Sequence, residues 1–216
     1  QALPKEKWMD KRREDVLDSP YFHMVFTVPQ ELNPLIYSNQ KRLYDALYQS
    51  VSATINELTL DAKHLGAKVG YICVLHTWGS EMNYHPHVHV ILLGGGLTPK
   101  KQWCDKGKEF FLPIKVLSKL FRGKYLSRLK ELWEQNELCF YGTSSKYRNH
   151  YAFKELLDTC YSKEWIPHCK KTFNGAGSVI NYLGKYTHRI AISNHRIICM
   201  DECTVTFYVK DYKEDG

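Results

Sequence analysis

The chain of 216 residues carries 30 lysines and arginines against 23 aspartates and glutamates, and its formal net charge is +7. It is long enough to bury a hydrophobic core, and its positive charge favours a polyanionic partner. The sequence has no run of about 18 apolar residues and no signal-peptide pattern at residues 1–18, so neither a membrane span nor export is expected. Its seven cysteines form an odd set without a Cys-x-x-Cys pair, which predicts reduced, mostly buried thiols in a cytoplasmic protein.

The first part of the chain alternates apolar segments with one long helical pattern. Residues 21–28 are typical of a buried strand, in which His23 is interpreted as a core or edge histidine. Between 38 and 65, apolar residues recur at helical spacing and predict an amphipathic helix. Residues 69–78 predict a second strand. Because only about six residues separate it from the next apolar segment, these two strands should pair antiparallel.

A histidine occupies every second position from His85 to His89, at the start of the third apolar segment. Alternate side chains of a strand share a face, so His87 and His89 should project together with their Cα atoms roughly 6–7 Å apart. Two neutral imidazoles held in this way can bind one metal ion. A buried ring nitrogen without a partner costs about 1–3 kcal/mol, so this pattern favours metal or phosphate chemistry over a plain core. The following glycines, 94–96, are interpreted as a turn at the end of the strand.

The second half of the chain mixes short strands with helices and contains no internal repeat. The elements alternate without the regular period of a doubly wound fold, so we predict an α+β fold with a mainly antiparallel central sheet flanked by helices. The lysines and arginines of the predicted helix 116–137 are interpreted as a solvated face. The expected elements are a short strand 109–113, a helix 116–137, an irregular stretch 140–151, a helix 152–161, a strand 165–173, a helix 178–188, and strands 196–200 and 204–209.

Further candidate residues lie before and after the histidine strand. His76 precedes His87 by eleven residues on the neighbouring predicted strand, where antiparallel pairing can bring it close as a third ligand. Tyr182 and Tyr186 are four residues apart, so they share one face of the predicted helix 178–188, about 6 Å from each other. Such a pair can reach one site, or can serve as core residues of an amphipathic helix.

Three segments in this order carry a family pattern: 76–79, 85–89 with glycines 94–96, and 182–196. They resemble the rolling-circle transposases of the insertion sequence ninety-one type, the two-tyrosine branch of the HUH (histidine, hydrophobic residue, histidine) endonucleases. The likeness extends through nearly the whole chain. It implies an HUH-endonuclease-like fold and a DNA transposase. Such an enzyme nicks and rejoins single-stranded DNA in rolling-circle transposition, through a metal-dependent step and a 5′-phosphotyrosine intermediate.

The resemblance also assigns roles to individual residues. It implies Mg²⁺ or Mn²⁺ as the cofactor, although three imidazoles by their softness also suit Zn²⁺. Supporting or DNA-binding roles are expected for basic residues near the predicted helix. The resemblance implies His76, His87 and His89 as metal ligands and Tyr182 and Tyr186 as first and second nucleophiles, while Glu81 and His85 are kept as alternative ligands. The supporting residues expected from their place near the predicted helix are Lys170, Lys171, Lys185, His188, Arg189 and Arg196.

The implied partner is single-stranded DNA at the ends of a transposon, and the fifteen tyrosines and five tryptophans suit stacking on unpaired bases. The expected setting is the bacterial cytoplasm, with nucleoid association during action and no small-molecule cofactor. Residues 1–19 are expected to form a basic lead-in that follows a missing zinc module, and residues 20–216 a catalytic domain that is incomplete at its C-terminus. The oligomeric state stays open.

Three alternatives remain at this point. The first is a relaxase or replication-initiator nickase of the HUH type. The second is a histidine-triad nucleotide hydrolase, against which Pro86 within the strand and the distant tyrosine pair both argue. The third is an inactive, metal-stabilised DNA-binding domain.

Overall fold

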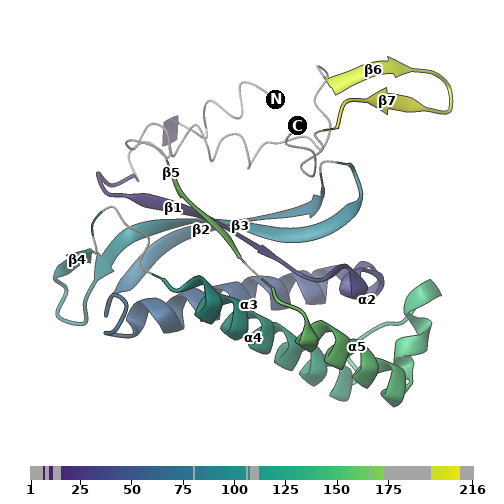
Figure 1. Ribbon diagram of the computed structural model, residues 1–216, viewed down its shortest axis with the longest axis horizontal. Coiled ribbons are helices and arrows are strands. Elements are labelled where there is room, and N and C mark those ends of the chain that lie inside the picture. The colour runs from purple at the N-terminus through teal and green to yellow at the C-terminus, as the bar shows by residue number, and fades with distance from the viewer. Residues whose placement is uncertain are drawn as a thin grey trace.

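An antiparallel sheet lies on a layer of helices in the computed structural model (Figure 1). The structure describes residues 7, 10–11, 16–79, 81–105, 107, 112–165, 167–172 and 196–209. The order of the strands is β2 (Lys68–Trp78), β3 (Tyr84–Leu97), β1 (Tyr21–Thr27) and β5 (His168–Thr172), with β4 (Trp103–Asp105) paired to the end of β3. Each of these pairs is antiparallel, which confirms the α+β class and the mainly antiparallel sheet.

The helices lie on one side of this sheet (Figure 1). No helix among the described residues is long and apolar enough to cross a membrane. A separate hairpin near the C-terminal end consists of β6 (Ile197–Met200) and β7 (Val205–Phe207). The helical elements are η1 (Gln30–Leu32), α2 (Asn33–Ser38), α3 (Gln40–Leu60), α4 (Ile114–Glu134), η2 (Gly142–Arg148) and α5 (His150–Ser162).

The alternation of side chains along β1 separates the two faces of the sheet. Phe22, Met24 and Phe26 are fully buried in one core with the apolar side chains of α3 and α4. The ring of Phe26 meets the edge of Phe121 of α4, with ring centroids 5.0 Å apart. Because the intervening residues point the other way, His23 lies on the opposite face of the sheet from these helices.

Most of the predicted elements within the described residues are confirmed with small shifts of their ends. The long helix begins at Gln40 rather than at 38, because the backbone of Asn39 leaves the helical region and separates α2 from α3. The side-chain amide of Asn39 donates to the carbonyls of Leu35 and Cys139 at 2.9 and 2.7 Å, which holds this break in place. The predicted helix 178–188 lies outside the described residues.

Pro86 lies inside β3, where the β2–β3 ladder is irregular, between the pairs His76–His87 and Trp78–Tyr84. A proline lacks the N–H that a regular ladder would require, and an irregularity removes that requirement.

The glycines 94–96 do not form a turn, because β3 continues through them to Leu97. They lie at a second irregularity, between the pairs Val69–Gly96 and Tyr71–Leu92, where β3 also takes up β4 as a partner. A predicted strand at 109–113 is not found in its described part, residues 112–113, and the unpredicted β4 precedes it.

The cysteines are less buried than expected. Burial raises the pKa of Cys73, Cys160 and Cys169 to about 12, so these thiols stay protonated near neutral pH. All seven are free thiols: Cys160 is buried, Cys73, Cys104 and Cys169 are half-buried, and Cys139, Cys199 and Cys203 are exposed.

The glycine segment provides a test of the sheet. A Cβ at Gly96 would collide with the carbonyl oxygen of Lys68 and lie 2.7 Å from its carbonyl carbon, so Gly96→Ala should separate β3 from β2. We expect a loss of about 1–3 kcal/mol in the free energy of unfolding, measured with urea. The matched control is Gly123→Ala in α4, where a Cβ meets nothing within 4 Å and the helix should gain about 0.5–1 kcal/mol. Equal stability of the two variants would contradict this account.

Candidate metal centre

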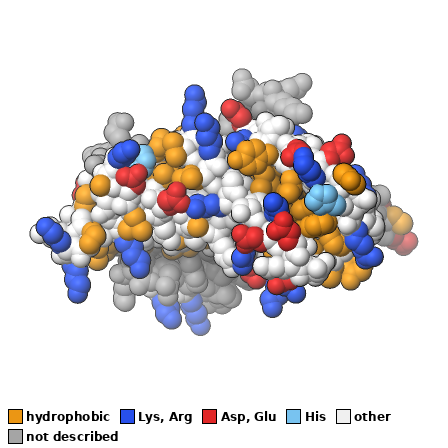
Figure 2. Space-filling model, turned by 90° about the horizontal axis from the view of Figure 1, so that it is seen from below, with side chains coloured by type: hydrophobic (Ala, Val, Ile, Leu, Met, Phe, Trp, Pro, Cys, Tyr) orange, Lys and Arg blue, Asp and Glu red, His pale blue; other side chains and the backbone are white. Residues whose placement is uncertain are grey.

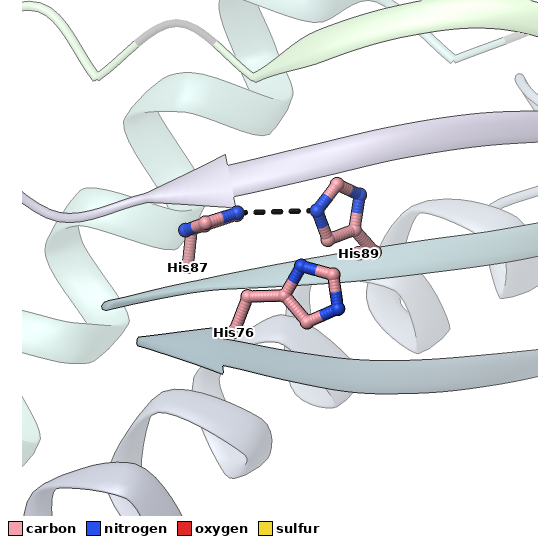
Figure 3. Close-up of side chains that lie close together, drawn as sticks. All are labelled: His76, His87 and His89. Atoms are coloured by element: carbon pink, nitrogen blue, oxygen red, sulfur yellow. Dashed lines mark hydrogen bonds between the residues drawn. The ribbon is translucent and has the colours of Figure 1, made fainter. Parts of the chain in front are cut away.

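Three histidines meet on the face of the sheet opposite the helices (Figure 3). His76 lies near the end of β2 and is the direct partner of His87 in the β2–β3 register. His89 follows His87 by two residues on the same face of β3. Each of the three rings offers a nitrogen, and these nitrogens all lie within 4.8 Å of one another. The pairing of β2 with β3 therefore brings together the three residues that the sequence singled out.

The spacing of His87 and His89 suits two ligands of one cation. Their Nε2 atoms are 3.1 Å apart (Figure 3). With metal–nitrogen bonds of about 2.0–2.1 Å, two adjacent ligands of a tetrahedral or octahedral ion are separated by about 2.9–3.4 Å. The observed separation falls within that range.

Each of these two rings also has a partner for its other nitrogen. His87 Nδ1 donates to the backbone carbonyl of His85 at 2.6 Å. His89 Nδ1 lies 2.8 Å from Nε2 of His23, which comes from β1. Such contacts fix the orientation of a ligand ring and direct its second nitrogen toward the ion. The residues present therefore fit a metal ion on structural grounds.

His76 is held differently. Its ring stacks on that of Trp78, with centroids 5.0 Å apart and planes 17° apart, and its centroid is 4.5 Å from that of His89. The three candidate ligands are only 3–9% exposed. A cation at their centre would give three buried ring nitrogens a common partner.

The two alternative ligands lie outside this group of nitrogens. Glu81 is exposed in the link between β2 and β3. The ring of His85 is half-buried, and its centroid is 5.2 Å from that of His87. Burial lowers the pKa of His85, and the contribution of this residue to the cluster is its carbonyl oxygen rather than its ring.

His23 is the residue that sequence reasoning missed. It is a buried, hydrogen-bonded histidine, as interpreted, but its partner is one of the candidate ligands. The strand pattern contains the signal that could have revealed it. Phe22, Met24 and Phe26 assign the apolar face of β1, so His23 must lie on the other face, where the register of β1 with β3 also places His87 and His89.

The remaining candidate residues are only partly described. Lys170 and Lys171 lie on β5, in register with His23 and Phe22 of β1. Arg196 lies at the base of the β6–β7 hairpin, where its Nε donates to the carbonyl of Tyr208 at 2.8 Å and its guanidinium faces the ring of Phe207. Five residues lie outside the described part of the chain: Tyr182, Lys185, Tyr186, His188 and Arg189.

The fold and the cluster define an α+β protein with a candidate three-histidine metal centre on an antiparallel sheet. Residues 70–216 match the sequence model of the Y2_Tnp family, which is described as "Putative transposase". The chain belongs to this transposase family, which confirms the family resemblance predicted from the histidine and tyrosine segments. The match does not favour a histidine-triad hydrolase.

Two curated relatives agree with this assignment. The chain is 37% identical over 214 residues to "Putative transposase y4qJ" of Sinorhizobium fredii, covering 99% of this chain and 54% of the relative. It is 29% identical over 193 residues to the "Transposase for insertion sequence element IS801" of Pseudomonas savastanoi pv. phaseolicola, covering 89% and 45%. The chain therefore spans about half the length of these relatives.

The solved structures that the chain resembles include a conjugative relaxase. The metal-bound form of TrwC in complex with oriT DNA superposes with a TM-score of 0.40 at 16% identity, covering 51% of this chain and 43% of that chain. A metal-free form of the same complex gives a TM-score of 0.40 at 15% identity, covering 79% and 73%.

Proposed function

We propose that this chain is the catalytic part of a DNA transposase that cleaves and rejoins single-stranded DNA at the ends of its element, with a divalent cation bound by His76, His87 and His89. The observation that carries the proposal is the group of three ring nitrogens within 4.8 Å of one another in a member of a transposase family. When bound, the cation would offset the negative charge of the phosphodiester and polarise it for attack. Mg²⁺ and Mn²⁺ are the first candidates, and the imidazole donors also suit Zn²⁺.

The proposed nucleophile is Tyr182, with Tyr186 acting in a second transfer. Once the phenol has lost its proton, its oxygen bonds to phosphorus and the bond from phosphorus to the 3′-oxygen breaks. The leaving 3′-oxygen takes up a proton, and the 5′-phosphate stays on the tyrosine. Because one phosphodiester replaces another, the free hydroxyl of a second strand can reverse the reaction without ATP.

The distribution of charge on the described surface is consistent with a DNA site away from the helices. Figure 2 shows the helix-covered face, where lysines and arginines are interspersed with aspartates and glutamates. Several basic residues of α4 are paired there, including Lys124 with Glu57 at 2.6 Å and Arg128 with Glu131 at 3.0 Å. This agrees with a solvated helical face, and we assign the DNA to the histidine face.

The metal assignment predicts a specific loss of binding. Replacing both His87 and His89 by alanine should weaken Mn²⁺ or Zn²⁺ binding by more than about 100-fold in calorimetric titration, because two of the three donors are removed. His76→Ala is the sharper test, since its affinity should fall similarly unless Glu81 or His85 is the third ligand. The control is His150→Ala on α5, an exposed histidine on the helical side of the sheet. Unchanged affinity in the double variant would refute the site.

The substrate assignment predicts a preference for single strands. With a net charge of +7, binding should weaken steeply as salt rises, because phosphate contacts release counterions. Exposed aromatic rings can stack on unpaired bases but not on paired ones. Fluorescence anisotropy with hairpin-bearing oligonucleotides and their duplexes, titrated with salt, measures both effects. Duplex binding as tight as single-strand binding across several sequences would count against the proposal.

The nucleophile is tested by the covalent product. Tyr182→Phe removes only the attacking oxygen, so it should abolish cleavage of a single-stranded oligonucleotide while the unfolding temperature stays within a few degrees of the wild type. Mass spectrometry of the wild-type adduct should find a 5′-phosphate on Tyr182. An adduct only on Tyr186 would reverse the order of the two tyrosines, and an adduct on histidine, or none, would reject the mechanism.

A further inference from the structure

Three histidine rings and one carbonyl form a continuous chain of short contacts through the candidate metal centre. The carbonyl oxygen of His85 accepts from His87 Nδ1 at 2.6 Å, and His87 Nε2 lies 3.1 Å from His89 Nε2. His89 Nδ1 in turn lies 2.8 Å from His23 Nε2. Each contact between ring nitrogens needs one donor and one acceptor, so the position of one proton determines the next.

Without a cation, one arrangement of neutral rings satisfies these three contacts. The carbonyl of His85 can only accept, so His87 carries its proton on Nδ1 and leaves Nε2 as an acceptor. His89 must then donate from Nε2, which leaves its Nδ1 as an acceptor. His23 completes the chain by donating from its Nε2.

A cation bound by His87 and His89 requires a different arrangement. Both Nε2 atoms would direct their lone pairs at the ion, so the proton of His89 must move to Nδ1. His89 then donates to Nε2 of His23, which must become an acceptor and carry its own proton on Nδ1. One proton changes position on each of these two rings, and the number of protons on the pair stays the same.

We propose that His23 is a positioning residue of the metal centre, which donates to His89 in the empty site and accepts from it when the cation is bound. This rests on the proposed function, because it assumes that His87 and His89 are ligands. A carboxylate at position 23 could only accept and an ammonium could only donate, whereas a neutral imidazole can do either. The rings of His23 and His89 lie within 6° of coplanar, and His23 is 8% exposed, so the contact is well aligned and shielded from water.

The first test compares two substitutions of His23. His23→Phe keeps an aromatic ring but removes both nitrogens, so Zn²⁺ affinity measured by calorimetry should fall about 10–100-fold. His23→Gln supplies an amide that can donate or accept, and it should recover most of the affinity. His150→Phe on α5 is the matched control and should bind as the wild type does. Unfolding temperatures recorded in parallel separate a general loss of stability from a loss at the site.

The second test reads the protons directly. In protein labelled with ¹⁵N-histidine, long-range proton–nitrogen spectra should place the proton of His89 on Nε2 without metal and on Nδ1 after addition of Zn²⁺, which is diamagnetic. His23 should change in the same direction. This measurement uses the wild-type chain, so it applies even if His23→Phe fails to fold.

The outcomes distinguish this inference from the proposed function. If the wild type binds no cation, the metal site itself is wrong and the role of His23 falls with it. If the wild type binds Zn²⁺ but His23→Phe binds equally well, or loses only stability, the metal site stands and the positioning role is overturned. A proton of His89 that stays on one nitrogen with and without Zn²⁺ also overturns it.

Discussion

The pairing of β3 with a strand on each side is the constraint on which the rest of this structure depends. Its ladder with β2 places His76 opposite His87, and its ladder with β1 places His23 within hydrogen-bonding distance of His89. Side chains alternate along a strand with a period of two, so a shift of one residue in either ladder would turn those histidines toward the helices. The site therefore depends on strand register more than on any single contact.

The helical layer holds that register. Phe22, Met24 and Phe26 of β1 are fully buried against α3 and α4, so a register shift would expose them to water. At about 1.5–3 kcal/mol for each large apolar side chain, the loss would far exceed the worth of a single histidine contact. The apolar face thus stabilises the arrangement of the polar face, although the two faces share no side chain.

The candidate metal centre combines a fixed backbone with movable protons. The ring nitrogens of His87 and His89 already have the separation expected of two ligands of one ion, so the distance between these two nitrogens would need little change on cation binding. What must change is the position of the hydrogen atoms in the series of contacts that links the carbonyl of His85, His87, His89 and His23. Histidine suits both parts of this arrangement, because its ring is rigid while its two nitrogens exchange the roles of donor and acceptor.

The sequence by itself determined what depends on local pattern. Short stretches of sequence are enough to predict several features of this protein. These are the alternation of His87 and His89, the apolar segments of β1 and β2, the long helices and the family resemblance. His76 could be predicted as the third metal ligand because its strand directly precedes β3, but the sequence left Glu81 and His85 as alternative ligands. Only the tertiary structure decided which nitrogens meet, that glycines 94–96 continue β3, and that His23 contacts His89. The reason is physical: His23 and His89 are 66 residues apart, and their contact exists only once β1 and β3 pair in one register.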